Sequence, residues 1–278
     1  TTAAEKIEFR DAAIFINSSA DGQLDIVADT EIQIAATTID INGAIVASGD
    51  VTFETGADII TASAGTSNFR AGVNAGNSIT SGGNYNTAAG DEAGTALTVG
   101  GSNTALGFES LKADTAGSHS VAIGVGALYT QNFTSATDAY NTAVGRSAGV
   151  LVTTGTQNTL IGGLAGDATT TGASNTAVGY AALGSNTTAS NNTAVGRTAL
   201  FTNTTGAELT AVGRESLLNN TTGSNSTAMG RSSMRANTTG ANNVGIGYSA
   251  LAANTTASQN TAVGMSALLS NTTAANNT

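Results

Sequence analysis

Residues 175–196 read NTAVGYAALGSNTTASNNTAVG, so the five-residue phrase that opens this stretch also closes it. Variants of the phrase, each ending in glycine, recur along most of the chain. Successive glycines are 17 residues apart, except for one interval of 21 residues between Gly124 and Gly145. The repeat glycines are Gly90, Gly107, Gly124, Gly145, Gly162, Gly179, Gly196, Gly213, Gly230, Gly247 and Gly264. A fixed period of this kind is typical of a solenoid or array of stacked units.

Each repeat predicts one coil of a narrow β-roll or β-solenoid. Positions are counted here from the repeat glycine as position 0, which places Asn-Thr-Ala-Val at −4 to −1 and Ala-Leu at +3 and +4. The short β-branched phrase predicts a strand. Alternation puts Thr and Val on one face of this strand and Asn, Ala and Gly on the other, and we expect the larger Val to face the interior. We expect the Ala-Leu half to be a second extended segment rather than a helical turn. Stacked at a strand spacing of about 4.8 Å, twelve coils predict a rod about 55 Å long.

The low apolar content of each coil predicts that chains associate. One Val and one Leu in 17 residues leave a lone coil under-filled, because burial at about 25 cal/mol per Å² must offset an ordering cost of about 1–2 kcal/mol per residue. We therefore expect chains to share a core, with contact across a smooth face of Ala and Gly.

A column of asparagines stands seven residues after the repeat glycine. Asparagine tolerates the left-handed backbone conformation that turns require, and its stacked amides can form a hydrogen-bonded ladder. Turn chemistry is the interpretation we favour for this column. Its members are Asn186, Asn203, Asn220, Asn237, Asn254 and Asn271.

The chain divides by composition into an acidic β-rich stalk segment (1–58), a transition (59–67) and about twelve repeats (68–278). The first segment carries 11 of the 19 acidic residues and shows short alternating stretches, such as Ile14-Phe15-Ile16 and Leu24-Asp25-Ile26. This pattern predicts a trimeric β-prism or triple β-helix. The last two residues begin the next phrase, so we expect the repeats to continue beyond residue 278.

Composition excludes several classes of site. The chain has no cysteine and a single histidine, His119, which excludes a Cys/His metal site and a cysteine nucleophile. A net charge of −10 argues against nucleic acid as a partner. No apolar run is long enough to span a membrane as a helix. We expect no enzyme activity, no cofactor and no bound metal, with a glycan-cleaving spike as a disfavoured alternative.

Two stretches carry a resemblance to known families. Residues 5–43, EKIEFRDAAIFINSSADGQLDIVADTEIQIAATTIDING, resemble a segment of bacteriophage tail fibre proteins. The repeats resemble tail fibre repeats and, more loosely, the repeats of trimeric autotransporter adhesin heads. These resemblances imply a fibrous homotrimer, and for the adhesin heads a left-handed parallel β-roll. The 17-residue period is longer than the usual adhesin-head repeat.

Candidate receptor contacts lie at the variable position +1 and in the insertion near 130–140. A row of Arg and Tyr at +1 suits recognition of a glycan or phosphate, with Glu215 as a possible charge partner. The competing interpretation is a solvated or subunit-contacting face. The insertion is interpreted either as a contact loop or as a functionless bulge, and His119 as an exposed residue at a strand edge. The candidates are Arg146, Tyr180, Arg197, Arg214, Arg231, Tyr248, Phe133 and Tyr140.

The sequence thus predicts a structural protein: the shaft of a homotrimeric phage tail fibre, located in the virion, that mediates host attachment. Expected partners are copies of itself, other tail or baseplate proteins, and a glycan or protein of the host cell surface. The main alternative is a bacterial adhesin head at the extracellular surface. An ice-binding solenoid is less favoured, because adjacent threonines in each Thr-Thr pair point to opposite faces.

Overall fold

The computed structural model describes residues 15–17, 25–27 and 63–278. The chain forms two compact units, Thr1–Asp58 and Ile59–Thr278.

The first unit contains one described pair of strands. Strand β1 (Phe15–Asn17) pairs antiparallel with β2 (Asp25–Val27), and Phe15 lies opposite Val27. Both coincide with stretches that alternation marked as strands. The other strands and the β-prism or triple β-helix predicted for 1–58 lie outside the described residues.

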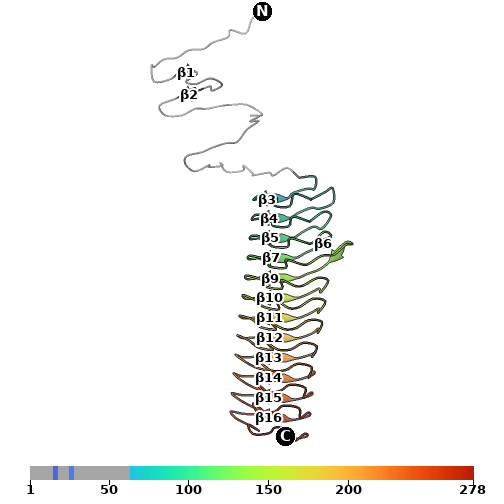
Figure 1. Ribbon diagram of the computed structural model, residues 1–278, viewed down its shortest axis with the longest axis vertical. Helices are drawn as coiled ribbons and strands as arrows, with labels where there is room; N and C mark the ends of the chain where they lie inside the picture. The colour runs from blue at the N-terminus through green and yellow to red at the C-terminus, as the bar shows by residue number, and fades with distance from the viewer. Residues whose placement is uncertain (1–14, 18–24, 28–62) are drawn as a thin grey trace, which may run out of the picture. The chain divides into compact units, whose positions relative to one another are not determined.

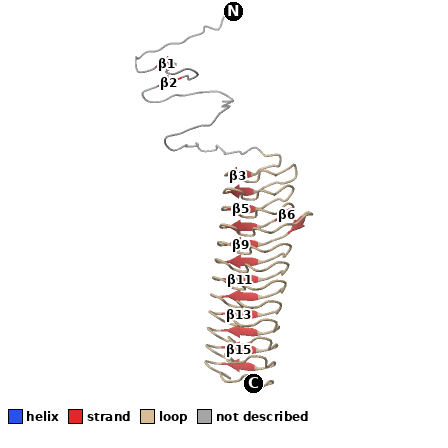
Figure 2. Ribbon diagram, viewed as in Figure 1, coloured by secondary structure: helices blue, strands red, loops and turns tan. Residues whose placement is uncertain are grey.

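The second unit is a parallel β-solenoid of about 11 turns, with no helix among its described residues (Figures 1 and 2). Each coil contributes one three-residue strand from positions −3 to −1, and equivalent residues pair in register, as Ala177 does with Ala194. The predicted solenoid and its strand are therefore confirmed. The parallel sheet consists of β3 (Phe69–Ala71), β4 (Thr87–Ala89), β5 (Thr104–Leu106), β7 (Val121–Ile123), β9 (Thr142–Val144), β10 (Thr159–Ile161), β11 (Thr176–Val178), β12 (Thr193–Val195), β13 (Thr210–Val212), β14 (Thr227–Met229), β15 (Val244–Ile246) and β16 (Thr261–Val263).

The strand faces are partitioned as alternation predicts, but the inner and outer faces are reversed. Ala at −2 is fully buried along most of the sheet, for example Ala177 and Ala194, whereas Val178 is half-buried and Val263 is exposed. The expectation that Val faces the interior is therefore wrong. The space beneath the strand is taken by Leu at +4, such as Leu183, which is fully buried, so only a small side chain fits at −2.

Exceptions to the consensus show that core volume is conserved across coils. Leu160 replaces Ala at −2, and the two flanking +4 positions are then Gly149 and Gly166 instead of Leu. A Cβ at either glycine would lie 2.7 Å from a methyl group of Leu160. In the same way Gly245 stands at −2 beside Met234, whose Cγ would lie 2.8 Å from an added Cβ.

This exchange of volume predicts a compensating pair of substitutions. Gly166→Leu alone should lower the free energy of unfolding by about 1–3 kcal/mol, because Leu160 already occupies the space. Backbone strain is no obstacle, since Gly166 has φ of 56° and Leu183 has the same value. Adding Leu160→Ala should recover most of the loss. A double-mutant cycle by denaturant unfolding measures this coupling, and additive effects of the two substitutions would contradict it.

The Ala-Leu half of each coil is a series of turns, so the predicted second extended segment is wrong. Left-handed backbone conformation at +2 and +4 prevents extension: Thr198 has φ of 53° and Leu200 has φ of 51°. The backbone N–H groups bond alternately within and between coils. Ala182 N–H donates to Gly179 within its coil, whereas Leu183 N–H donates to Ala199 of the next coil.

Two columns of buried asparagine, at −4 and +7, close many of the coils from inside, and the column at +7 runs from Asn186 to Asn254. The side-chain Nδ2 groups of Asn175 (−4) and Asn186 (+7) both donate to the carbonyl oxygen of Ala189, at 2.9 and 3.1 Å. Each column also links neighbouring coils: Asn203 Nδ2 donates to Asn186 Oδ1 at 3.2 Å, and Asn192 N–H donates to Asn175 Oδ1 at 3.0 Å. The predicted amide ladder is confirmed. The left-handed residues are those at +2, +4 and −5, however, and not the asparagines at +7.

The interior of the solenoid is filled by one chain. Stacked Ala, Leu and Asn side chains are buried along its length, so the premise that a lone coil is under-filled is wrong. The Ala column lies inside and offers no smooth outer face. The outward residues of the sheet are Thr at −3 and an aliphatic residue at −1, because alternate residues of a strand share a face.

Candidate functional site

Position +1 lies at the corner where the chain leaves each strand. The preceding repeat glycine has φ between 122° and 135° in these coils, a conformation that turns the chain sharply after the sheet. The residue that follows projects into solvent: all four arginines predicted as contacts at +1 are exposed, as are Tyr180 and Tyr248. In-register stacking therefore brings the predicted +1 candidates into one column along the rod.

Glu215 organises three arginines of this region. Its carboxylate accepts hydrogen bonds from Arg214 Nε at 3.0 Å and Nη2 at 2.6 Å. Arg235 Nε lies 3.4 Å from the other carboxylate oxygen, and Arg197 Nη1 of the preceding coil lies 4.0 Å away. Glu215 is thus the charge partner that the sequence suggested, whereas Arg235, at position +5, was not foreseen.

The electrostatics of this cluster favour the ionised carboxylate. The hydrogen bond from Arg214 is the main cause that lowers the pKa of Glu215, and the charges of Arg235 and Arg231 act in the same direction. Arg231 itself lies over the ring of Tyr248, with its guanidinium carbon 5.7 Å from the ring centroid. The +1 residues of adjacent coils are therefore coupled by charge and by a cation–π contact.

A second charged group lies in the N-terminal coils. Lys112 pairs with Glu92 and, at 2.6 Å, with Glu109, and its ammonium group lies 5.6 Å from the centroid of the Tyr129 ring. The hydrogen bond that Lys112 donates to Glu109 is the first cause that raises the pKa of Lys112. Here one cation meets two carboxylates, so this group is net acidic.

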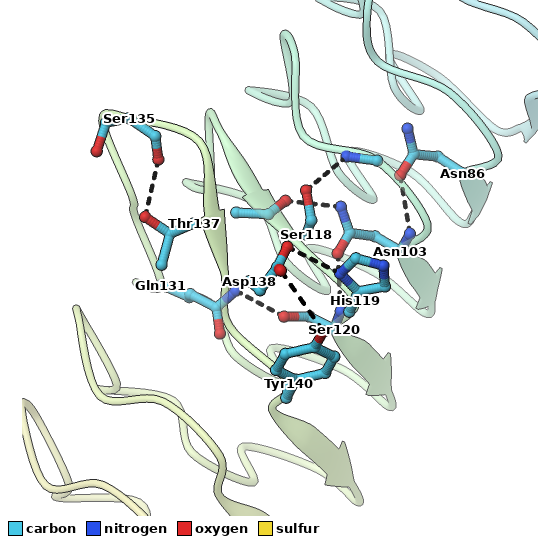
Figure 3. A network of polar contacts seen from close by, with 12 residues as sticks. Asn86, Asn103, Ser118, His119, Ser120, Gln131, Ser135, Thr137, Asp138 and Tyr140 are labelled. Carbon is cyan, nitrogen blue, oxygen red and sulfur yellow. Dashed lines mark hydrogen bonds and ion pairs between the residues drawn. The ribbon is translucent and has the colours of Figure 1, made fainter.

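The four-residue insertion forms a small extension beside the main stack. Strand β6 (Gly117–Ser118) pairs parallel with β8 (Thr137–Asp138), outside the twelve-stranded sheet (Figures 1 and 3). Phe133 is only 6% exposed, because it turns inward against Gly117. Its side chain is not presented to a receptor, in contrast to what the sequence predicts.

At the exposed surface of the insertion, its carboxylate Asp138 and phenol Tyr140 meet the imidazole of His119 from the preceding coil. His119 Nδ1 lies 3.2 Å from Asp138 Oδ1, and the His119 ring stacks on Tyr140 at 5.0 Å between centroids (Figure 3). His119 and Tyr140 both occupy position −5 of adjacent coils, which explains why they meet. The sequence named both residues, but Asp138 depends on the path of the insertion and was missed.

Asp114 anchors the insertion from beneath. Asp114 is buried at +7 in place of asparagine and accepts hydrogen bonds from Gly117 N–H at 3.0 Å, Phe133 N–H at 3.1 Å and Gln131 Nε2 at 2.6 Å. Desolvation by burial raises its pKa despite these donors.

The raised pKa of Asp114 predicts a pH-dependent contribution to stability. The folded state binds the proton more tightly than the unfolded chain, so the contribution is fully present below the unfolded pKa of about 3.9 and declines as pH rises through the folded value. Relative to Asp114→Asn, the wild-type chain should therefore lose stability as pH rises from about 4 towards neutrality. Denaturant titrations of both chains across this range test the trend. A comparison of wild type with Glu215→Gln should show the opposite pH trend, since the stabilisation by Glu215 is lost as pH falls. A constant difference between wild type and Asp114→Asn would contradict the assignment.

Within the described residues, no three His, Cys, Asp or Glu side chains are grouped so that they could hold a metal ion. The same part of the chain contains no helix of the length and apolarity needed to cross a membrane.

Comparisons of the chain with protein-family models, curated proteins and solved structures find no match.

Proposed function

We propose that the repeats form the structural shaft of a bacteriophage tail fibre, which extends host-binding surfaces away from the particle. The observation that supports this most is the in-register bonding of each coil to the next. Strands, turns and both asparagine columns all contribute bonds between neighbouring coils. A stack bonded in this way resists bending, and its length follows from the number of repeats.

In the proposed mechanism, the shaft extends away from the particle and makes several weak contacts with the host surface. A stiff shaft keeps several contact points at fixed separations, so that one attachment raises the effective concentration of the next. Host surface glycans or proteins and other tail or baseplate proteins are the partners in this proposal, and the chain performs no chemical step.

Association into a homotrimer is part of the proposal, through a different surface from the one the sequence suggested. Several aliphatic side chains at −1 are exposed on the outer face of the sheet, and such a face is suited to contact between chains. Light scattering at several dilutions should give three times the 27.1 kDa chain mass. The exposed residues at −1 are Leu106, Ile161, Met229, Ile246 and Val263.

The location of the protein tests the function directly. An antibody raised against 63–278 should label the tails of phage particles that carry the gene, as seen by immuno-electron microscopy. Labelling confined to the surface of bacterial cells would contradict the tail fibre proposal and support the adhesin alternative. A matched antibody against a phage capsid protein controls for access to the particle.

A further inference from the structure

The solenoid is electrically polar along its length. Residues 63–167 contain six acidic and three basic residues, whereas residues 168–278 contain two acidic and four basic residues. The C-terminal coils are thus net positive by two in a chain whose net charge is −10. All four of their basic residues are arginines, and all belong to the region around Glu215.

These arginines are held in place but remain available. Glu215 is 16% exposed, whereas the side chains of Arg197, Arg214 and Arg235 are 59%, 50% and 52% exposed. A guanidinium group has five N–H donors, and one carboxylate can accept from only a few of them. The cluster therefore keeps an excess of positive charge and many donors directed to solvent.

The residues at position +1 of these coils place three arginines between two tyrosines on the surface. Five consecutive coils present Tyr180, Arg197, Arg214, Arg231 and Tyr248, which we call the Arg–Tyr column. Neighbouring members are separated by about one strand spacing, so the column spans about 19 Å. A linear ligand lying along the rod meets three guanidiniums in succession and an exposed phenol ring at each end.

We propose that the Arg–Tyr column binds an anionic polysaccharide. Guanidinium forks match carboxylate and sulfate oxygens, and tyrosine rings offer flat apolar faces on which sugar rings stack. The proposal rests on the attachment role proposed above and names the ligand class of that surface. The acidic N-terminal coils oppose binding outside the column, which restricts the ligand to the C-terminal coils.

The test uses the complete 278-residue chain with defined probes. Polygalacturonate and dextran sulfate supply carboxylate and sulfate, uncharged dextran is the neutral control, and duplex DNA is the competing polyanion. Biolayer interferometry at low and high salt should show binding to an anionic polysaccharide that weakens with salt. The stronger of the two charged probes identifies the anionic group.

The variants distinguish binding by the Arg–Tyr column from binding by positive charge elsewhere on the chain. Arg197→Gln with Arg231→Gln should weaken binding at least about tenfold, and it leaves Arg214 and Arg235 paired with Glu215. Arg146→Gln removes one positive charge from position +1 of a coil outside the column and should leave binding unchanged. Tyr180→Ala with Tyr248→Ala should weaken binding of the polysaccharide but not of DNA. Thermal melts establish that each variant is folded.

Four outcomes would overturn the proposal: unchanged binding by the folded double-arginine variant, an equal loss in Arg146→Gln, equal binding of uncharged dextran, or tighter binding of DNA than of either charged polysaccharide. Each concerns the ligand alone. Labelling of phage tails tests the shaft independently, so a failure here is distinguishable from a failure of the proposed function.

Discussion

Gly162→Ala is expected to destabilise the solenoid by more than about 3 kcal/mol. Gly162 has φ of 133°, a conformation that L-residues rarely adopt. An added Cβ would lie 2.5 Å from the carbonyl oxygen of Gly179 and 2.7 Å from its carbonyl carbon, which are backbone atoms of the next coil. Relief requires the two coils to separate, and separation breaks the strand pairing between β10 and β11. Denaturant unfolding of the complete chain measures the loss.

The adjacent glycine is the matched control for this prediction. Gly163 has no left-handed φ, and the nearest atom to an added Cβ is Tyr180 Cδ2 at 3.8 Å, an ordinary contact. Gly163→Ala should therefore change stability by no more than about 0.5 kcal/mol. Equal effects of the two substitutions would contradict the view that close stacking of the coils requires glycine at the repeat position.

Asn220→Ala is expected to have the second largest effect, a loss of about 3 kcal/mol or more. Asn220 is fully buried and its Nδ2 donates to Asn203 Oδ1 at 2.8 Å and to Gly223 O at 2.9 Å. Its Oδ1 accepts from Asn237 Nδ2 at 2.9 Å. Removing the amide takes one hydrogen-bond partner from each of three groups, Asn203 Oδ1, Gly223 O and Asn237 Nδ2.

A second asparagine of the same column provides the comparison. Gly206 O accepts from both Asn203 and Asn192, whereas position −4 of the next coil is Leu209, so Gly223 O accepts a side-chain hydrogen bond from Asn220 alone. Asn203→Ala should therefore cost less than Asn220→Ala in the same unfolding experiment. The reverse order would contradict the assigned role of the paired amides.

The sequence predicted the period, the strand and the amide ladder because these depend on residue identity at a fixed spacing. It did not predict which strand face is inside. Val is β-branched and larger than Ala, so it is the residue expected in the core. The outcome depends on Leu at +4, which reaches the same space from the other side of the coil. The exchange of Leu160 with Gly149 and Gly166 was visible in the sequence and is the signal that could have placed Ala inside.

The candidate site was predictable to the extent that it follows the period. Position +1 forms one exposed column because in-register stacking preserves every column, and Glu215 follows Arg214 directly. Arg235 lies at +5 and reaches Glu215 across a turn, so the column pattern alone does not reveal it. Phe133 and Asp138 belong to the insertion, where the period is interrupted and side-chain direction depends on the local path of the chain.

The length of the rod as a function of repeat number tests the central claim most directly. Deleting residues 193–260 removes four 17-residue coils and joins Asn192 to Thr261, which preserves the repeat phrase. Small-angle X-ray scattering of the complete chain and of the deletion, with masses from light scattering, gives both the length and the cross-section. The in-register solenoid predicts a particle about 19 Å shorter with an unchanged cross-section. An unchanged length with a reduced cross-section, or loss of the folded state, would contradict it.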